Sequence, residues 1–241
     1  MRVLVIRPQP SASRTARHLA DLGHEPVLLP LAAPQHDPEA VRVALSRRHS
    51  AIAITSGEAA RVIADLGEDL DRHLLTTVFA VGRASARAML DSGFRTVLTP
   101  EGDGRDLADL IIGHCRDYGT PPDPLLYLAG RPRAPQFEAR LTEAAIAHET
   151  VDCYRMEPVR PPRAELKAVI IDNPPDAIVF YSRESAVRFF ELPAVEESQD
   201  VLARTLFLCM SANVAAAVPE RFAPSVVVSA RPDEESLLDL L

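Results

Sequence analysis

Short hydrophobic runs recur along the chain, and each is followed by a polar segment whose apolar residues have helical spacing. The segment 105–115, for example, places Leu107, Leu110 and Ile111 on one helix face. Ten runs have the length of a strand, namely residues 3–6, 27–31, 51–55, 78–81, 96–98, 125–129, 150–154, 177–181, 206–209 and 225–228. Runs that are apolar throughout and alternate with helices indicate parallel sheets covered by helices on both faces. We therefore expect an α/β fold with ten strands in two sheets.

The sequence also contains a long-range repeat. Residues 51–60 (AIAITSGEAA) resemble residues 177–186 (AIVFYSRESA), which aligns Ser56 with Ser182 at an offset of 126 residues. Further matching pairs are 3–6 with 125–128, 77–79 with 205–207, and 107–110 with 237–240. A period of this length indicates domain duplication and not a solenoid, which disfavours an interaction scaffold. We expect two similar domains, each about half of the chain.

Composition and charge narrow the class of protein. The 241 residues are 47% hydrophobic and 25% charged, which is typical of a globular protein. With 26 basic and 34 acidic residues the formal net charge is −8, so nucleic acid is a disfavoured partner. The longest uncharged apolar runs are far shorter than the roughly 18 residues of a membrane span. The apolar run after Met1-Arg2 is too short for a signal peptide, and we expect a cytoplasmic protein without membrane contact.

Several kinds of catalytic site have no candidate residues in the sequence. The three cysteines lie far apart, and the seven histidines include no zinc-type pair, so we expect no metal. A GxxxxGKS/T loop is absent, and Gly102-x-Gly104 is followed by Leu107 where a dinucleotide-binding loop needs a third glycine. We find no GxSxG motif and no crowded pair of carboxylates after a strand. Metal enzymes, nucleotide-dependent enzymes, serine hydrolases and glycosidases are therefore disfavoured.

Arginines and serines follow the predicted strands. Ligands of open parallel sheets bind outside the carboxyl ends of the strands. Arginine lies within three residues of the strand end at five of six such turns, and Ser56 and Ser182 open the following helices. Guanidinium groups and the free N–H groups of helix N-termini suit a polyanion of carboxylate type. Two other interpretations stay open: arginines on the outer surface, enriched by a GC-rich genome, and serines that only cap helices.

A set of short motifs runs in order from one end of the chain to the other. They are VLVIRP at 3–8, PL at 30–31, ITS at 54–56, VGRASA at 81–86, YLAGR at 127–131, VDCYR at 151–155 and FYS at 180–182. Together these motifs resemble the uroporphyrinogen-III synthase family. The resemblance implies two flavodoxin-like domains joined by a two-stranded antiparallel linker. Domain one would comprise residues 1–33 plus 159–241, and domain two residues 36–156, with linkers at about 27–34 and 150–158.

The resemblance also implies an activity. The family cyclises the linear tetrapyrrole hydroxymethylbilane to uroporphyrinogen III, with inversion of ring D and loss of water, on the route to haem, cobalamin and chlorophyll. Such a lyase uses no cofactor and no metal. The substrate carries eight carboxylates, which are ionised at neutral pH and match the polyanion that the strand-end residues suit. A monomer that receives its substrate from hydroxymethylbilane synthase is implied as well.

Site residues follow from the strand-end positions and the resemblance together. Tyr154, in the second linker, matches the family's candidate general acid, although an aromatic residue there could also serve only to pack the linker. Substrate binding is expected for Arg7, Ser56, Gly82, Arg83, Ser85, Gly130, Arg131, Ser182, Arg183, Ser211 and Asn213. The hydroxyl and backbone N–H groups among these are expected to bind substrate carboxylates.

One segment departs from the family's pattern. Where many relatives have glycine and then threonine, residues 209–214 read CMSANV. By the internal repeat, Met210 stands opposite Gly82 and Asn213 opposite Ser85, so either Ser211 or Asn213 replaces the missing hydroxyl. The departure supports an alternative function: a catalytically impaired two-domain module of the same fold that binds tetrapyrroles or regulates their synthesis.

Overall fold

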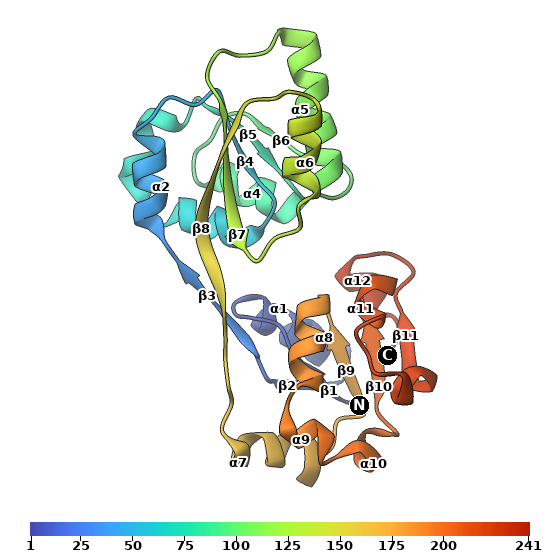
Figure 1. Ribbon diagram of the computed structural model, residues 1–241. Helices are drawn as coiled ribbons and strands as arrows, with labels where there is room; N and C mark the ends of the chain where they lie inside the picture. The colour runs from blue at the N-terminus through green and yellow to red at the C-terminus, as the bar shows by residue number, and fades with distance from the viewer. The chain divides into compact units, whose positions relative to one another are not determined.

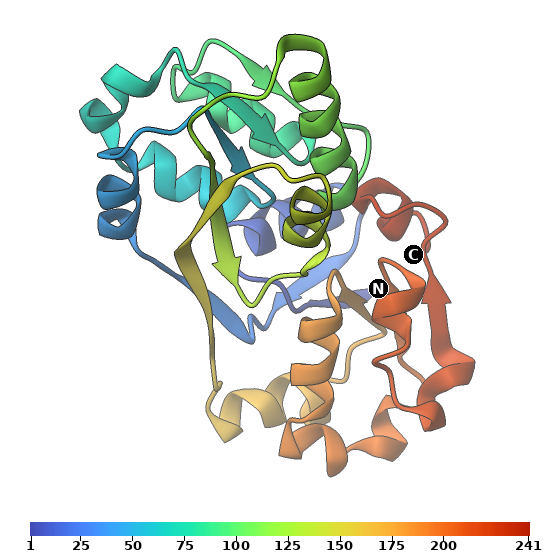
Figure 2. The ribbon, with the colours of Figure 1, turned by 45° about the horizontal axis from the view of Figure 1, so that its top comes forward.

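The chain divides into two compact units in the computed structural model, which describes residues 1–241. Unit 1 combines Met1–Ala33 with Glu157–Leu241, and unit 2 comprises Pro34–Met156. Each unit is built on a sheet with helices on both faces (Figure 1, Figure 2). The α/β class expected from the hydrophobic pattern is therefore confirmed.

The sheet of unit 1 is entirely parallel. Its strands are β1 (Arg2–Val5), β2 (Glu25–Leu28), β9 (Ala177–Phe180), β10 (Leu206–Cys209) and β11 (Val226–Val228). They lie in the order β11-β10-β9-β1-β2, which is the 2-1-3-4-5 order of flavodoxin-like folds. From β1 the chain adds β2 on one side, and then adds β9, β10 and β11 on the other side. The order of strand addition therefore reverses between β1 and β9. This switch point is the usual ligand-binding position of such folds.

Helices cover both faces of the unit 1 sheet. They are α1 (Ser11–Asp21), α7 (Arg163–Leu166), α8 (Arg183–Phe190), α9 (Pro193–Glu196), α10 (Gln199–Leu202), α11 (Ala212–Ala215) and α12 (Glu234–Leu238), with a π-helical turn at Lys167–Asp172 and a 3₁₀ turn at Glu220–Ser225. On one face, Leu19 of α1 and Leu237 of α12 pack on Val3 and Val5. On the other face, Phe180, Phe189, Phe190, Phe207 and Phe222 form a continuous cluster of aromatic rings.

The sheet of unit 2 repeats the same arrangement. Its strands are β3 (Ala32–His36), β4 (Ala51–Ile54), β5 (Thr77–Ala80), β6 (Val97–Leu98), β7 (Leu125–Arg131) and β8 (His148–Pro158), in the order β3-β8-β7-β4-β5-β6. The five strands from β8 to β6 are parallel, and their order becomes 2-1-3-4-5 when β7 and β8 are counted first. The switch point of this unit therefore lies between β7 and β4.

One strand was not among the ten expected runs, so the number of strands is eleven. Strand β3 lies at the sheet edge beside β8. The N–H of Asp37 donates to the carbonyl of Cys153, and the N–H of Val159 to the carbonyl of Leu31, so the two strands run antiparallel. The residues Ala32–His36 read AAPQH, and a polar edge strand that contains proline has no hydrophobic run to reveal it.

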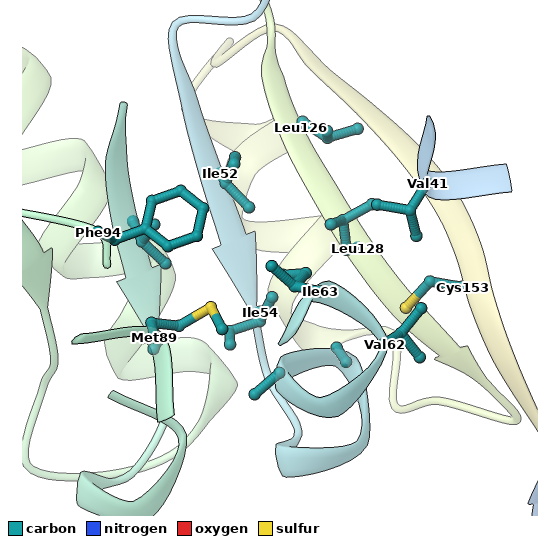
Figure 3. Close-up of a cluster of buried hydrophobic side chains, with 14 of the residues drawn as sticks. Val41, Ile52, Ile54, Val62, Ile63, Met89, Phe94, Leu126, Leu128 and Cys153 are labelled. Atoms are coloured by element: carbon teal, nitrogen blue, oxygen red, sulfur yellow. The ribbon is translucent and has the colours of Figure 1, made fainter. Parts of the chain in front are cut away.

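Helices of unit 2 enclose its sheet in two layers. They are α2 (Pro38–Leu45), α3 (Gly57–Ala64), α4 (Arg83–Asp91), α5 (Gly104–Tyr118) and α6 (Gln136–Glu143), with a 3₁₀ helix at Gly67–His73. Figure 3 shows Ile54 of β4 and Leu128 of β7 beside Ile63 of α3 and Met89 of α4, in the core of one face. Helices α5 and α6 pack on the other face. Burial of each large apolar side chain of this kind stabilises the folded state by about 1.5–3 kcal/mol relative to leaving it exposed.

Local sequence sets where these helices begin. The side chain of Asp103 caps α5 by accepting from the N–H of Arg105. The Asp103 N–H donates to the side chain of Asp106, which completes a capping box. Asp37 caps α2, which has Pro38 at its first position.

No helix of the molecule is both long and apolar enough to cross a membrane.

Candidate functional site

A pocket opens at the switch point of unit 2, beyond the carboxyl ends of β4 and β7. Its volume is about 380 Å³. The lining includes Thr55, Ser56, Asp103, Gly104, Arg105, Tyr127, Gly130, Arg133, Gln136, Phe137 and Tyr154. Three residues expected from the sequence, Ser56, Gly130 and Tyr154, therefore meet here. This position at the strand ends makes the pocket the candidate functional site.

Tyr154 lies across the backbone of Gly130. The two residues pair between β8 and β7, immediately after a register shift at Ala129 and Gly130. A Cβ atom at position 130 would lie 2.6 Å from Cε1 of Tyr154 and would overlap its hydroxyl end. Burial raises the pKa of the Tyr154 phenol, and the hydrogen bond with Ser56 partly offsets this effect. Tyr154 is therefore protonated at neutral pH and able to donate a proton.

Ser56 has two roles in this geometry. Its Oγ accepts a hydrogen bond from the backbone N–H of Glu58 at 3.1 Å and so caps α3. The same hydroxyl bonds Tyr154. Because a hydroxyl has two lone pairs and one hydrogen, helix capping and contact with the phenol are compatible.

The deeper part of the pocket contains a second phenol that sequence reasoning missed. Tyr127 is 1% exposed, and its hydroxyl lies 2.8 Å from the hydroxyl of Thr55. The Tyr127 ring packs on Phe137 with 4.5 Å between ring centres. Burial raises the pKa of Tyr127. A tyrosine inside an otherwise aliphatic strand was the available signal, because a buried phenol needs a hydrogen-bond partner.

The arginines in the pocket differ from the one predicted. Arg133 lines it, with Nε 2.8 Å from Glu138 and Nη1 2.6 Å from Asp152. The hydrogen bond to Glu138 raises the pKa of Arg133, and the same bond lowers the pKa of Glu138. Arg105 also lines the pocket; its guanidinium is exposed and makes no ion pair. Arg131 is instead 61% exposed, pairs with Asp152 at 2.8 Å and does not line the pocket.

Three further predicted residues follow β5 and do not line this pocket. Gly82 adopts a φ of 80°, which favours glycine, and precedes α4. Arg83 is exposed as the first residue of that helix. Ser85 is 6% exposed, and its hydroxyl faces Gly57 at the start of α3. The buried position of Ser85 gives it a packing role between α3 and α4 in this structure.

In unit 1, the predicted Arg7 already has partners. Its guanidinium lies over the Tyr181 ring, 3.9 Å from the ring centre. Nη1 is 3.3 Å from a carboxylate oxygen of Glu234 and 3.1 Å from the hydroxyl of Thr15. Arg7 is thus a bound group and not a free cation at the strand end.

The remaining predicted residues of unit 1 occupy helix starts. Ser182 caps α8 by accepting from the N–H of Ser185 at 3.2 Å, and Arg183 after it is exposed. Ser211 precedes α11 without capping it through its side chain, and Asn213 is exposed within that helix. Ser211 and Asn213 are thus both without a helix-capping bond.

A larger cavity of about 910 Å³ lies elsewhere on unit 1, beside α8 and α9. Arginines and glutamates line it in equal number, and Arg163 and Glu197 pair across 3.2 Å. None of the predicted site residues lines this cavity. Size alone therefore does not identify the functional site, and the strand-end pocket of unit 2 has the better-suited chemistry.

No three His, Cys, Asp or Glu side chains lie close enough together to hold a metal ion.

Comparison with known families decides the class of protein. Residues 13–239 match the family model of uroporphyrinogen-III synthase HemD. The chain belongs to the uroporphyrinogen-III synthase family. Uroporphyrinogen-III synthases are enzymes of tetrapyrrole synthesis, and the resemblance of the seven sequence motifs is therefore confirmed. No curated protein matches the sequence significantly.

Solved uroporphyrinogen-III synthases share the fold. The enzyme of Helicobacter pylori superimposes with a TM-score of 0.64 at 16% identity, over 100% of this chain and 98% of that chain. A mutant enzyme of the extreme thermophile Thermus thermophilus gives a TM-score of 0.59 at 22% identity, over 99% of this chain and 96% of that chain. At such identities the likeness shows the two-domain α/β fold alone.

Proposed function

We propose that the protein cyclises hydroxymethylbilane to uroporphyrinogen III with inversion of ring D and loss of water. The observation that supports this most directly is the strand-end pocket of unit 2, where the half-buried phenol of Tyr154 bonds Ser56 and two arginines line the same pocket. A neutral phenol can protonate a leaving hydroxyl group, and guanidinium groups bind carboxylates. Membership of the uroporphyrinogen-III synthase family supports a tetrapyrrole as the substrate.

Tyr154 acts as the general acid in this proposal. It donates its proton to the hydroxymethyl oxygen as the carbon–oxygen bond breaks, which releases water and leaves an azafulvene cation. A substituted pyrrole carbon attacks that cation to give a spiro intermediate, which fragments and recloses. The ring carbon that closes the macrocycle loses a proton, and this proton restores the phenol. Acid assistance of this kind contributes about 10² to 10⁴ in rate.

Orientation of the bilane is the larger task of the site. Arg105, which makes no ion pair, binds a carboxylate of the substrate, Arg133 adds positive charge while it stays paired with Glu138 and Asp152, and Thr55 and Tyr127 form the floor of the pocket. Held in this way, the bilane reaches the spiro geometry before the uncatalysed closure to the unrearranged isomer I. The protein works as a cytoplasmic monomer without a metal or cofactor, and it receives the bilane from hydroxymethylbilane synthase.

The test is an isomer assay with the purified protein. Hydroxymethylbilane is added without metal or nucleotide, the products are oxidised, and the isomers are separated by chromatography. We expect isomer III, formed faster than isomer I forms in buffer. Isomer I alone, at the buffer rate, would refute the activity. Binding of the tetrapyrrole without accelerated closure would instead favour the alternative, a module that binds or regulates, which the segment at 209–214 suggested.

A further inference from the structure

Four polar side chains converge at the switch point of unit 1, each from a different element. Arg7 follows β1, Thr15 lies on α1, Tyr181 follows β9, and Glu234 begins α12. The Glu234 carboxylate accepts from the Tyr181 hydroxyl at 2.9 Å and from the hydroxyl of Thr15. Nη1 of Arg7 lies 3.3 Å from the second carboxylate oxygen. One carboxylate is therefore bound by a guanidinium and two hydroxyls.

The donors that bind this carboxylate are held in place independently of it. The guanidinium of Arg7 stacks on the Tyr181 ring and also donates to Thr15. Thr15 is fully buried. Burial raises the pKa of Tyr181, so its hydroxyl remains a donor at neutral pH. These donors form a preorganised site for a carboxylate, which happens to be supplied by the chain itself.

Comparison with unit 2 shows what Glu234 replaces. Helices α12 and α5 both begin after a capping aspartate, Asp233 in unit 1 and Asp103 in unit 2. The internal repeat aligns these two helices, so the counterpart of Glu234 is Gly104. Gly104 lines the open pocket of unit 2. A glutamate therefore stands in unit 1 where unit 2 has no side chain.

Two other members of the cluster, Tyr181 and Arg7, are also larger than their counterparts in unit 2. Tyr181 precedes the capping Ser182 as Thr55 precedes Ser56, so the two are counterparts. The repeat that aligns β1 with β7 sets Arg7 opposite Ala129. The same alignment sets Thr15 opposite Phe137, which lines the pocket of unit 2, so this pair differs in the opposite direction. Glu234 and Tyr181 therefore fill in unit 1 the place that Gly104 and Thr55 leave open in unit 2.

We propose that Arg7, Thr15 and Tyr181 form a carboxylate-binding site that Glu234 fills in the ligand-free protein, and that a ligand carboxylate binds there by displacing Glu234. The exchange conserves charge, since one carboxylate leaves Arg7 as another arrives. Glu234 is free to swing outward because its side chain is 35% exposed and it is the first residue of α12. Leu237 and Leu238 keep that helix buried during the exchange.

Glu234 acts as an internal competitor in this arrangement. A ligand that needs the site binds only to the fraction of molecules in which Glu234 has left it, and the apparent dissociation constant rises accordingly. The choice of a tetrapyrrole carboxylate as the ligand rests on the proposed function. The exchange itself requires only a carboxylate ligand that reaches Arg7.

The experiment compares two isosteric substitutions in the same helix. Uroporphyrin III, a stable fluorescent octacarboxylate, is titrated into the full-length protein and into the variants Glu234→Gln and Glu235→Gln. Glu235 is exposed and its side chain makes no hydrogen bond or ion pair, so its substitution controls for the change in net charge. We expect Glu234→Gln to bind the probe about tenfold more tightly and Glu235→Gln to remain within about twofold of the wild type. Equal or weaker binding by Glu234→Gln than by Glu235→Gln would overturn the proposal.

A second variant tests the role of Arg7. Adding Arg7→Met to Glu234→Gln should remove the gain in affinity, because the guanidinium that the ligand would contact is gone. Retention of the gain would assign it to another site and overturn the exchange. If Glu234→Gln fails to fold, a wild-type structure with uroporphyrin III decides: an intact Arg7–Glu234 pair beside the bound probe overturns the proposal, and Arg7 on a probe carboxylate supports it.

The isomer assay keeps this inference separate from the proposed function. A wild-type protein that makes no isomer III, but whose Glu234→Gln variant binds the probe about tenfold more tightly, would refute the activity and support the exchange. A protein that makes isomer III, with equal probe affinities for the two glutamine variants, would do the reverse.

Discussion

The phenol ring of Tyr154 crosses Gly130 so closely that any side chain at position 130 would overlap it. The register shift between β7 and β8, where Cys153 of β8 is skipped, places these two residues side by side. The position of the proposed general acid thus depends on a residue that contributes no side chain. Glycine is required at position 130 because any Cβ atom there would occupy the space of the Tyr154 ring.

The substitution Gly130→Ala should therefore displace Tyr154. We expect kcat for isomer III to fall about tenfold or more, because the phenol loses its alignment with the leaving group. The matched control is Gly113→Ala in α5, where an added Cβ meets no atom within 4 Å. Gly113→Ala should keep full activity and gain about 0.5–1 kcal/mol in free energy of unfolding. Equal activity of the two variants would contradict the role of Gly130.

Removal of the Tyr154 hydroxyl tests the acid directly. The substitution Tyr154→Phe should lower kcat about tenfold or more while KM changes little. Because only the protonated phenol donates, the wild-type rate should fall as pH rises through the pKa of Tyr154, which burial raises above its ordinary value of 10.0. The variant should lack this alkaline decline. A decline that persists in Tyr154→Phe would assign it to another group.

One buried phenol, Tyr127, and two half-buried ones, Tyr154 and Tyr181, make the fold sensitive to alkali. Burial raises the pKa values of Tyr127, Tyr154 and Tyr181 above 10.0, so near and above that pH the unfolded chain releases protons that the folded chain retains. The stabilisation is complete below the unfolded value and is lost as pH rises above it. Urea unfolding between pH 8 and 11 should show a decreasing free energy of unfolding.

A pair of variants isolates this effect. Tyr127→Phe should reduce the slope of the decline by up to about 1.4 kcal/mol per pH unit, since one buried phenol no longer titrates. Tyr118 is 79% exposed, so Tyr118→Phe should leave the slope as it is in the wild type. An identical pH dependence of the free energy of unfolding in both variants would show that Tyr127 does not contribute to the decline.

Arg105, which lines the pocket, and Arg131, which the sequence had indicated, can be separated by function. Arg105→Ala should raise KM for hydroxymethylbilane about tenfold, because a charge-assisted hydrogen bond to a substrate carboxylate is lost. Arg131→Ala should stay within about twofold, since Arg131 pairs with Asp152 outside the pocket. Steady-state kinetics at low ionic strength give both values. A larger effect at Arg131 would return the substrate contact to the residue that the sequence had indicated.

The sequence predicted strands well where hydrophobic runs are continuous, as in residues 51–55, because a strand buried on both faces needs them. The hydrophobic pattern missed strand β3, since its pairing with β8 comes from the backbone alone. The family resemblance had implied the antiparallel linker to which β3 belongs. Positions at strand ends were predictable for Ser56 and Gly130 by the same logic. Which arginine faces the pocket was not, because this depends on partners such as Glu138 that bind Arg133 across the fold.

Glu234 illustrates the same difficulty. It is one acid in an acidic C-terminal segment, which reads as a solvated surface. Only the packing of α12 on β1 and β9 brings it to Arg7. A long-range pair of this kind has no local signal in the sequence.

Unit 1 is built from two segments that are separated in the chain by the whole of unit 2, which affects how it folds during synthesis. Strand β1 is an interior strand of its sheet, yet its neighbour β9 begins only at Ala177. As the chain leaves the ribosome, β1 and β2 emerge first and must wait, with β1 unpaired along one edge, until all of unit 2 has followed. Unit 2 has every strand of its sheet available once β8 is made. The nascent chain therefore carries an apolar strand without its partner through the formation of a whole neighbouring domain, which is the stage at which a chaperone has most to protect.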